Sequence, residues 1–414
     1  MAVPQRKPSG KVWLGRLALV VLSPLLLFAL LEAAGWLFGV PLRFDNETYQ
    51  SRHEMRICRF EPQHLEDYCS PELFEPKGET TSVFVFGGSS VEGHPKGVTL
   101  PFPYYLRGAL EKRHPGEYSV HNLGHACKDS IFLRSCFERV VAARPDVIVI
   151  YAGHNDFGAM MEAIPQIPML IERHPWIVDL EYALARTRAY SLLLHLAAAA
   201  GKEIDTPWQR LPDPQFERSK RIVLHEYAAN IDAVVERAGR EGIRVILVTL
   251  VSNLHESPLR YDWWGVGAYT AESGELPDFL QPWWSHYSAG MEHWRAQRFE
   301  PALASFAEAR DHFLKSRAPS ELNEGLRAVA AVNDHVQLVD FERILHGAAV
   351  EEGIGCNFFG SGDFSGRELG QGKRGMDPKV TPEGDDPWCD QFHPNPRTQR
   401  MIAEALLPAV LSLR

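Results

Sequence analysis

The chain has 414 residues, of which 45% are hydrophobic and 23% charged, a composition typical of a globular protein with one large domain or two. The formal net charge is −10, and the body of the chain has no basic stripe. These features argue against a protein that holds nucleic acid by neutralising its phosphates. The six cysteines are too few for a disulfide scaffold, and none has the doubled CxxC spacing of a zinc site.

The N-terminal region has the pattern of a membrane anchor. A basic leader with Arg6, Lys7, Lys11 and Arg16 precedes an uncharged run at residues 17–31. Beyond Glu32 the apolar character resumes to Val40, and a helix over residues 12–40 would be roughly 40 Å long, enough to cross a hydrocarbon core of about 30 Å. The flanking charges predict a cytoplasmic N-terminus and an extracytoplasmic body. A signal peptide, for which we find no convincing cleavage site, and a buried core helix remain the alternatives.

The cysteines fall in three neighbouring sets, Cys58/Cys69, Cys127/Cys136 and Cys356/Cys389. An oxidising exterior would favour disulfides, and proximity in sequence makes Cys58 with Cys69 the expected pair. Scattered buried thiols are the alternative.

Short apolar strands alternate with helices over most of the chain. The predicted strands span residues 82–86, 118–122, 146–151, 244–249 and 336–341. The predicted helices span residues 103–113, 131–143, 217–241, 322–331 and 397–413. Alternation of this kind predicts an α/β fold with a parallel sheet that is covered on both faces.

We expect three parts in the chain: residues 1–40 as leader and transmembrane anchor, residues 41–80 as a connector, and residues 81–414 as one α/β domain. Helical insertions are expected at about 157–215, with a helix at 182–200, and at about 256–315. A Gly-rich loop is expected at 352–387, before the closing helix.

The second insertion contains a cluster of tryptophans, Trp263, Trp264, Trp283, Trp284 and Trp294. We expect them to be buried between insertion and core, with a sugar-binding platform as the alternative. The spacing of small and apolar residues over 290–309 is similar to one tetratricopeptide hairpin. Because a single hairpin cannot bury its own apolar face, it should pack on the main domain.

Four short segments lie at predicted strand ends or before the final helix. They are Phe-Gly-Gly-Ser-Ser at 86–90, Asn-Leu-Gly-His-Ala-Cys at 122–127, Tyr-Ala-Gly-His-Asn-Asp at 151–156 and Asp-Gln-Phe-His-Pro at 390–394. Open parallel sheets bind ligands at the carboxyl ends of their strands. Each segment alone is typical of an ordinary turn or a surface histidine. Their order and their positions together indicate a catalytic site.

In this order the segments resemble the blocks of the SGNH (GDSL-like) hydrolase superfamily. The resemblance covers residues 80–160 and 386–412 well and the core between them loosely. It implies a flavodoxin-like three-layer sandwich with a parallel sheet. The implied catalytic triad is Ser89, Asp390 and His393, and the implied oxyanion hole consists of Ser89, Cys127 and Asn155.

The residue types fit these roles. A serine hydroxyl is a weak nucleophile until a base accepts its proton, which is the role expected of His393. Asp390 would hold the imidazole in the required tautomer and stabilise the imidazolium. The tetrahedral intermediate needs hydrogen-bond donors already in place, and the Ser89 N–H and the Asn155 amide can supply two.

Two positions depart from the family pattern. Cys127 stands where the family usually has a glycine; the role needs only a backbone N–H, and Gly124 is the alternative donor if the loop is shifted. Gly88 stands where the commonest form has an aspartate. Ser90 is a competing nucleophile, and His154 is expected to be a wall of the site rather than a second base.

We therefore expect an extracytoplasmic serine esterase, without metal or cofactor, that hydrolyses an acyl ester by way of an acyl-enzyme. From its compartment alone, the expected substrate is an O-acyl group on a glycan or another envelope component. The expected partners are this ester and the membrane, through the N-terminal helix, and nucleic acid is not among them. An acyltransferase with the same triad and a non-catalytic scaffold that keeps the fold are the alternatives.

Overall fold

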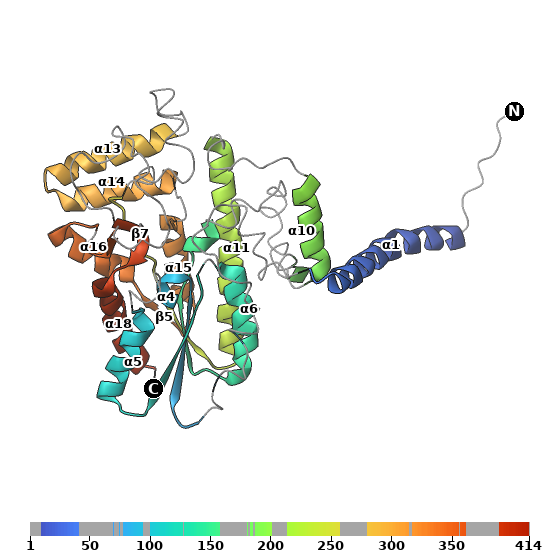
Figure 1. Ribbon diagram of the computed structural model, residues 1–414, viewed down its shortest axis with the longest axis horizontal. Coiled ribbons are helices and arrows are strands. Elements are labelled where there is room, and N and C mark those ends of the chain that lie inside the picture. The colour runs from blue at the N-terminus through green and yellow to red at the C-terminus, as the bar shows by residue number, and fades with distance from the viewer. Residues whose placement is uncertain are drawn as a thin grey trace. The chain divides into compact units, whose positions relative to one another are not determined.

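The computed structural model describes residues 10–40, 69, 74, 78–93, 100–126, 128–157, 180, 183–184, 187–200, 213–256, 280–313, 317–355, 357–361 and 389–413. The chain forms two compact units. One contains Met1–Asn46 and Asp179–Ile204, and the other contains Glu47–Val178 and Asp205–Arg414. The second unit holds the sheet and the predicted site residues (Figure 1).

The larger unit is built on a five-stranded parallel sheet with the strand order β2-β1-β3-β4-β5. The strands are β1 (Thr81–Gly87), β2 (Tyr118–Gly124), β3 (Val147–Tyr151), β4 (Arg244–Val248) and β5 (Val336–Val339). All five residues of β3 are buried, as expected of a central strand covered on both faces. This order is that of the flavodoxin-like folds, in which ligands bind at the carboxyl ends of the strands.

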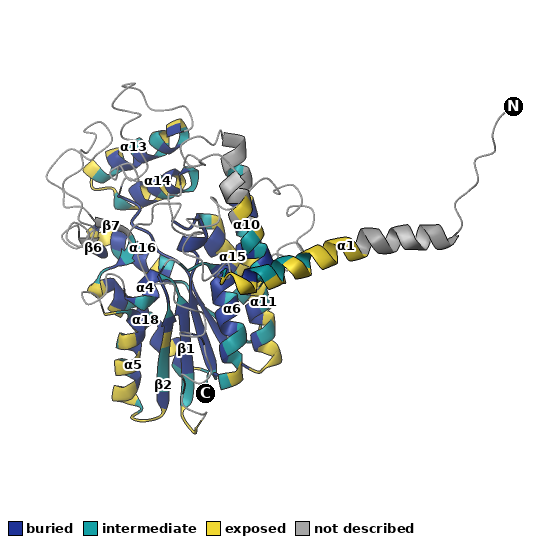
Figure 2. Ribbon diagram, turned by 45° about the vertical axis from the view of Figure 1, so that its right-hand side comes forward, coloured by how far each residue is buried: buried dark blue, intermediate teal, exposed yellow. Residues whose placement is uncertain are grey.

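Helices cover both faces of the sheet (Figures 1 and 2). On one side α5 (Phe102–Arg113) packs against α18 (Pro396–Leu411), and on the other α6 (Ser130–Val140) packs against α11 (Asp213–Arg240). A short 3₁₀ turn, η3 (Val141–Ala143), extends α6. Side chains cap the starts of α6 and α18: Asp129 accepts from the Phe132 N–H, and Asn395 accepts from the Thr398 N–H. The three predicted layers are therefore present.

The predicted strands and helices are confirmed in position, and the structure adds several elements. They are α4 (Ser89–Glu92), α13 (Gln281–Arg295), α16 (Phe341–Glu352), β6 (Phe359–Ser361) and β7 (Cys389–Pro394). The predicted last strand ran to Phe341, but β5 ends at Val339 because the Asp340 side chain caps the start of α16. The predicted 322–331 helix is α15 (Ser320–Val332).

The Asp-Gln-Phe-His-Pro segment, predicted as a loop, is part of β7. This strand pairs antiparallel with β6, outside the main sheet. The register is irregular, because Phe359 lies opposite Pro394 while Ser361 lies opposite Cys389. Such a short, irregular ribbon has no alternating apolar pattern from which it could be recognised.

The helices α13 and α14 (Phe299–His312) pack as the predicted hairpin (Figure 1). A Cβ atom at Gly290 would lie 2.4 Å from the Phe306 ring, so only glycine permits this approach. Trp283 is fully buried and stacks on Tyr287, with ring centroids 5.0 Å apart. Burial of the cluster is confirmed for this residue, but Trp284 and Trp294 are only half-buried, and Trp263 and Trp264 lie outside the described residues.

The smaller unit contains α1 (Gly10–Leu37) and α10 (Arg188–Ala200), which pack together. The Glu32 carboxylate accepts a 2.7 Å hydrogen bond from the Ala189 N–H at the start of α10, and Arg188 donates to the Val40 carbonyl. Large apolar side chains of α1 are exposed (Figure 2), among them Leu22, Leu25, Leu26, Leu27, Leu30, Trp36 and Leu37. A search of the described residues for a helix of the length and apolarity needed to span a membrane finds none.

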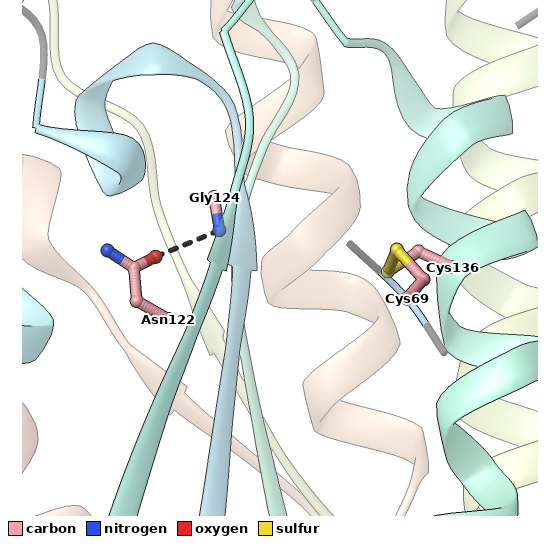
Figure 3. Close-up of a disulfide and its surroundings, with 4 residues drawn as sticks. All are labelled: Cys69, Asn122, Gly124 and Cys136. Carbon is pink, nitrogen blue, oxygen red and sulfur yellow. Dashed lines mark hydrogen bonds between the residues drawn. A yellow bond between two sulfur atoms is a disulfide. The ribbon is translucent and has the colours of Figure 1, made fainter. Parts of the chain in front are cut away.

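In the larger unit a disulfide joins Cys69 to Cys136 of α6 (Figure 3). The expected pairing of Cys58 with Cys69 is therefore wrong. Nearness in sequence is not the requirement for a bridge; the two Cα atoms must come within about 4.4–6.8 Å. The fold brings the Cys136 Cα to 5.1 Å from that of Cys69, across 67 residues of sequence, and both side chains are buried.

Candidate active site

The turn that carries Ser89 depends on the two glycines before it. A Cβ atom at Gly87 would lie 2.2 Å from the Tyr151 carbonyl oxygen, and one at Gly88 would lie 2.7 Å from Asn155 Nδ2. Glycine is therefore needed at both positions, first for the approach of β1 to β3 and then for the approach of the Asn155 amide. Ser89 follows at once as the first residue of α4, at the carboxyl end of β1.

Ser89 and His393 form the central contact of the site. Ser89 Oγ lies 2.7 Å from His393 Nε2, although 304 residues separate them in sequence. Ser89 is only 8% exposed. This is the hydrogen-bond distance that a serine nucleophile and its general base require. The predicted pairing of these two residues is therefore present in the structure.

The third predicted triad member, Asp390, lies on β7 three residues before His393. Its side chain is outside what the structure describes, so its role in orienting the imidazole stays a prediction.

The Asn155 amide lies beside the nucleophile turn. Its Nδ2 donates a 2.9 Å hydrogen bond to the Lys128 carbonyl, and it faces the Cα of Gly88 closely enough to exclude a Cβ there. An asparagine amide has two N–H donors, so one remains for a substrate oxygen. The geometry fits the predicted oxyanion role of Asn155.

The loop that contains Cys127 is tied to the nucleophile turn, although Cys127 itself lies outside the described residues. The His125 N–H donates to the Gly87 carbonyl at 2.9 Å, and the Ala126 N–H donates to Glu92 Oε2, also at 2.9 Å. These bonds fix the two residues before Cys127. Glu92 lies three residues after Ser89, and its hydrogen bond with Ala126 could not be predicted from the sequence. Acidic residues are common in the first turn of a helix because they interact favourably with the helix dipole.

The N–H of Gly124, the alternative oxyanion donor, already donates a hydrogen bond within the protein. Its N–H donates a 2.8 Å hydrogen bond to Asn122 Oδ1 (Figure 3), and Asn122 Nδ2 donates to the Val91 carbonyl at 2.7 Å. A Cβ atom at Gly124 would lie 2.4 Å from the Glu92 backbone nitrogen. The glycine thus serves close packing against α4 and does not present its N–H to a substrate.

Ser90, the competing nucleophile, has a different environment from Ser89. Its hydroxyl donates to the Phe392 carbonyl at 3.3 Å, and its carbonyl accepts a 3.0 Å bond from Gln399 Nε2. Gln399 also accepts a bond from the Phe102 N–H at 2.8 Å. Ser90 therefore joins the nucleophile turn to the histidine strand and to α18. Nothing in the sequence singled out Gln399, which lies on the buried face of a predicted helix.

His154 and Asp156 of the 151–156 segment have pKa values that are shifted strongly in opposite directions. Burial, followed by the proximity of the basic His393 and Arg310 side chains, lowers the pKa of His154 to about 3, so this ring is neutral at ordinary pH. It is buried beside Asn155, and with so low a pKa it is too weakly basic to act as a second base.

Asp156 is shifted the other way. Burial first, and then the negative charge of Asp129, raise its pKa to about 8. Its Oδ1 accepts a 3.0 Å bond from the Ser130 N–H. The carboxyl is therefore largely protonated at neutral pH. Among the described residues, no group of three or more His, Cys, Asp or Glu side chains could hold a metal ion.

No protein-family model matches the chain, and no curated protein matches its sequence. Solved structures do match. A GDSL-like lipase from Bacteroides thetaiotaomicron has a TM-score of 0.37 and 14% identity, over 85% of this chain and 98% of the other. The acetyl xylan esterase AlAXEase has a TM-score of 0.35 and 13% identity, over 80% of this chain and 99% of the other.

A member of the lipolytic G-D-S-L family from Veillonella parvula has a TM-score of 0.32 and 13% identity, over 80% of this chain and 98% of the other. The structure is thus similar to those of GDSL-like esterases and lipases.

Proposed function

We propose that the chain is a serine esterase with Ser89 as nucleophile and His393 as general base. The observation that supports this best is the 2.7 Å contact between Ser89 Oγ and His393 Nε2 at the carboxyl edge of the sheet. A scaffold that merely kept the fold would have no need of a nucleophile and base within hydrogen-bond distance of each other.

The reaction proceeds in two halves. His393 Nε2 accepts the hydroxyl proton while Ser89 Oγ attacks the ester carbonyl carbon. The tetrahedral intermediate collapses, the alcohol leaves with the proton from the imidazolium, and the acyl group stays on Ser89. Water then gives a proton to His393 and attacks the acyl-enzyme, and the acid is released as Ser89 Oγ recovers the proton.

The negative oxygen of each tetrahedral intermediate would accept from the Ser89 N–H and the free N–H of the Asn155 amide. The first N–H groups of a helix have no partner within the helix, and Ser89 is the first residue of α4. The Cys127 N–H is the proposed third donor, since its neighbours Ala126 and His125 are held against Glu92 and Gly87.

We further propose that this chemistry takes place outside the cytoplasm, with the N-terminal segment as a membrane anchor. The Cys69–Cys136 disulfide favours an oxidising compartment, and the exposed leucines of α1 favour contact with lipid. In that location the proposed substrate is an O-acyl group on a glycan or another envelope component. Reporter fusions after residue 45 test the topology: an exported phosphatase should be active and a cytoplasmic fluorescent protein dark, and the reverse would contradict it.

Hydrolysis of p-nitrophenyl acetate by the full chain tests the activity itself. The parent protein should release nitrophenolate, and Ser89→Ala should not. An inactive parent, or a Ser89→Ala variant as active as the parent, would contradict the proposal.

A further inference from the structure

We propose that His154 is a positioning residue, which holds the Asn155 loop and the His393 strand against the segment between the helical hairpin and α15. This inference rests on the proposed esterase function and adds a residue to its machinery. His154 lies between Gly153 and Asn155, next to the oxyanion donor, and its side chain is 7% exposed.

The first contact is with the segment that follows the hairpin. The Ala318 N–H donates a 3.1 Å hydrogen bond to His154 Nδ1. Because Nδ1 accepts, the ring proton of the neutral imidazole is on Nε2. Burial keeps the ring neutral, with its pKa lowered to about 3, so this acceptor is present throughout the pH range in which an esterase would work.

The second contact is with the strand that carries the general base. The His154 ring lies against the Phe392 ring, with centroids 5.5 Å apart, and Phe392 lies 4.4 Å from the ring of His393. The Phe392 carbonyl in turn accepts from the Ser90 hydroxyl. The ring of His154 thus supports the residue that connects the nucleophile turn to the catalytic histidine.

The helix α15, which begins two residues after Ala318, is hydrogen-bonded to the chain just beyond the end of β4. Asn323 accepts from the Leu250 N–H at 2.8 Å and donates to the Leu250 carbonyl at 2.9 Å. Leu322 and Leu250 close over Gly153, where a Cβ atom would lie 2.7 and 2.8 Å from their methyl groups. Gly153 has φ +147°, a conformation that favours glycine. Gly153 is therefore fixed by Leu322 and Leu250, while His154 is held by Ala318 and Phe392. Loss of the His154 contacts should therefore displace its neighbour Asn155.

Two substitutions test separately the hydrogen bond of His154 with Ala318 and its ring contact with Phe392. In His154→Asn the amide oxygen takes the place of Nδ1 and keeps the acceptor, whereas His154→Phe keeps the ring against Phe392 and leaves the buried Ala318 N–H without a partner. A displaced oxyanion donor weakens binding of the transition state but not of the ester. We expect His154→Phe to lower kcat at least about 10-fold with KM within about threefold, and His154→Asn to restore most of kcat.

The readouts are kcat and KM for p-nitrophenyl acetate, with thermal unfolding of each variant. A kcat for His154→Phe within twofold of the parent, or equal losses in both variants, would overturn the proposal.

Should His154→Phe fail to fold, ¹⁵N NMR of the histidines in the parent protein decides: Nδ1 of His154 should be unprotonated, and its chemical shift should stay constant from pH 5 to 9. A protonated Nδ1 or a titration in that range would overturn it. Failure of the esterase function itself would appear separately, as activity that survives Ser89→Ala.

Discussion

Ser89 Oγ and His393 Nε2 lie 2.7 Å apart across 304 residues of sequence. The contact is possible because β1 delivers Ser89 to the carboxyl edge of the sheet, while β7 returns the chain to that edge just before α18. The Ser90 hydroxyl and Gln399 then join the two segments directly. The pair is therefore held by these side-chain-to-backbone hydrogen bonds as well as by its own hydrogen bond.

The nucleophile and the base should fail as a unit. Ser89→Ala, His393→Ala and the double variant should each lose on the order of 10⁴-fold or more in kcat, with nearly equal losses, because either residue alone cannot carry out the attack. Asp390→Ala should cost less than either, since the role predicted for Asp390 is to orient the base and not to react. Steady-state hydrolysis of p-nitrophenyl acetate measures all four variants, and additive losses in the double variant would show that the residues act independently.

Asn155→Ala should lower kcat by about 10²- to 10³-fold, or about 2.7–4 kcal/mol, with KM little changed. The amide would act on the developing oxyanion, so its loss affects the transition state rather than binding of the ester. Asn155→Asp is the matched control for shape, and it should be as inactive as the alanine variant because it lacks the donor. Activity within a few-fold of the parent in either variant would mean that Asn155 only shapes the turn.

Gly88→Ala tests the position of the Asn155 amide by changing the residue that this amide faces. A Cβ atom there would lie 2.7 Å from Asn155 Nδ2, so the amide must shift, and kcat should fall by about 10- to 10²-fold. Gly108 in α5 is the matched control, because nothing lies within 4 Å of a Cβ atom there. Gly108→Ala should leave kcat within about twofold. Equal effects at the two glycines would contradict the assigned position of Asn155.

The elements of the sheet could be predicted from the sequence, since each strand is a short apolar run that ends in a turn. The order of the segments also predicted the contact between Ser89 and His393. The strand β7 and the partner of Cys69 could not be predicted, because both depend on contacts between distant segments that leave no local periodicity. The same holds for the links made by Gln399 and Ala318, whose residue types are ordinary at their positions.

The protonated Asp156 should make stability depend on pH. In the unfolded chain its carboxyl ionises near its ordinary pKa of 3.8, whereas burial raises the pKa to about 8 in the folded protein. Between these values the folded state holds a proton that the unfolded chain has released, so the contribution of Asp156 is present below pH 3.8 and is lost as the pH rises through about 8.

Asp156→Asn keeps the acceptor for the Ser130 N–H and cannot ionise. Relative to the parent, its free energy of unfolding should therefore improve steadily from pH 5 to pH 8. Urea unfolding of both proteins at these two pH values measures the difference. If the difference in free energy of unfolding between variant and parent is the same at pH 5 and pH 8, the pKa of Asp156 does not differ between the folded and the unfolded state.

Removal of the Cys69–Cys136 disulfide should destabilise the fold without affecting the chemistry. A bridge across 67 residues stabilises by about 4 kcal/mol through the entropy of the unfolded chain. The Cys69→Ala/Cys136→Ala variant should unfold at lower urea concentration and keep its kcat below the transition. A loss of kcat with unchanged stability would place the bridge in the catalytic machinery instead.

Labelling by a fluorophosphonate probe tests the identity of the nucleophile most directly, because only a serine activated by a base reacts with it. The Ser90 hydroxyl donates to a backbone carbonyl and is not positioned to react. We expect the parent and Ser90→Ala to be labelled, and Ser89→Ala and His393→Ala not to be. Labelling that persists in Ser89→Ala and disappears in Ser90→Ala would contradict the assignment.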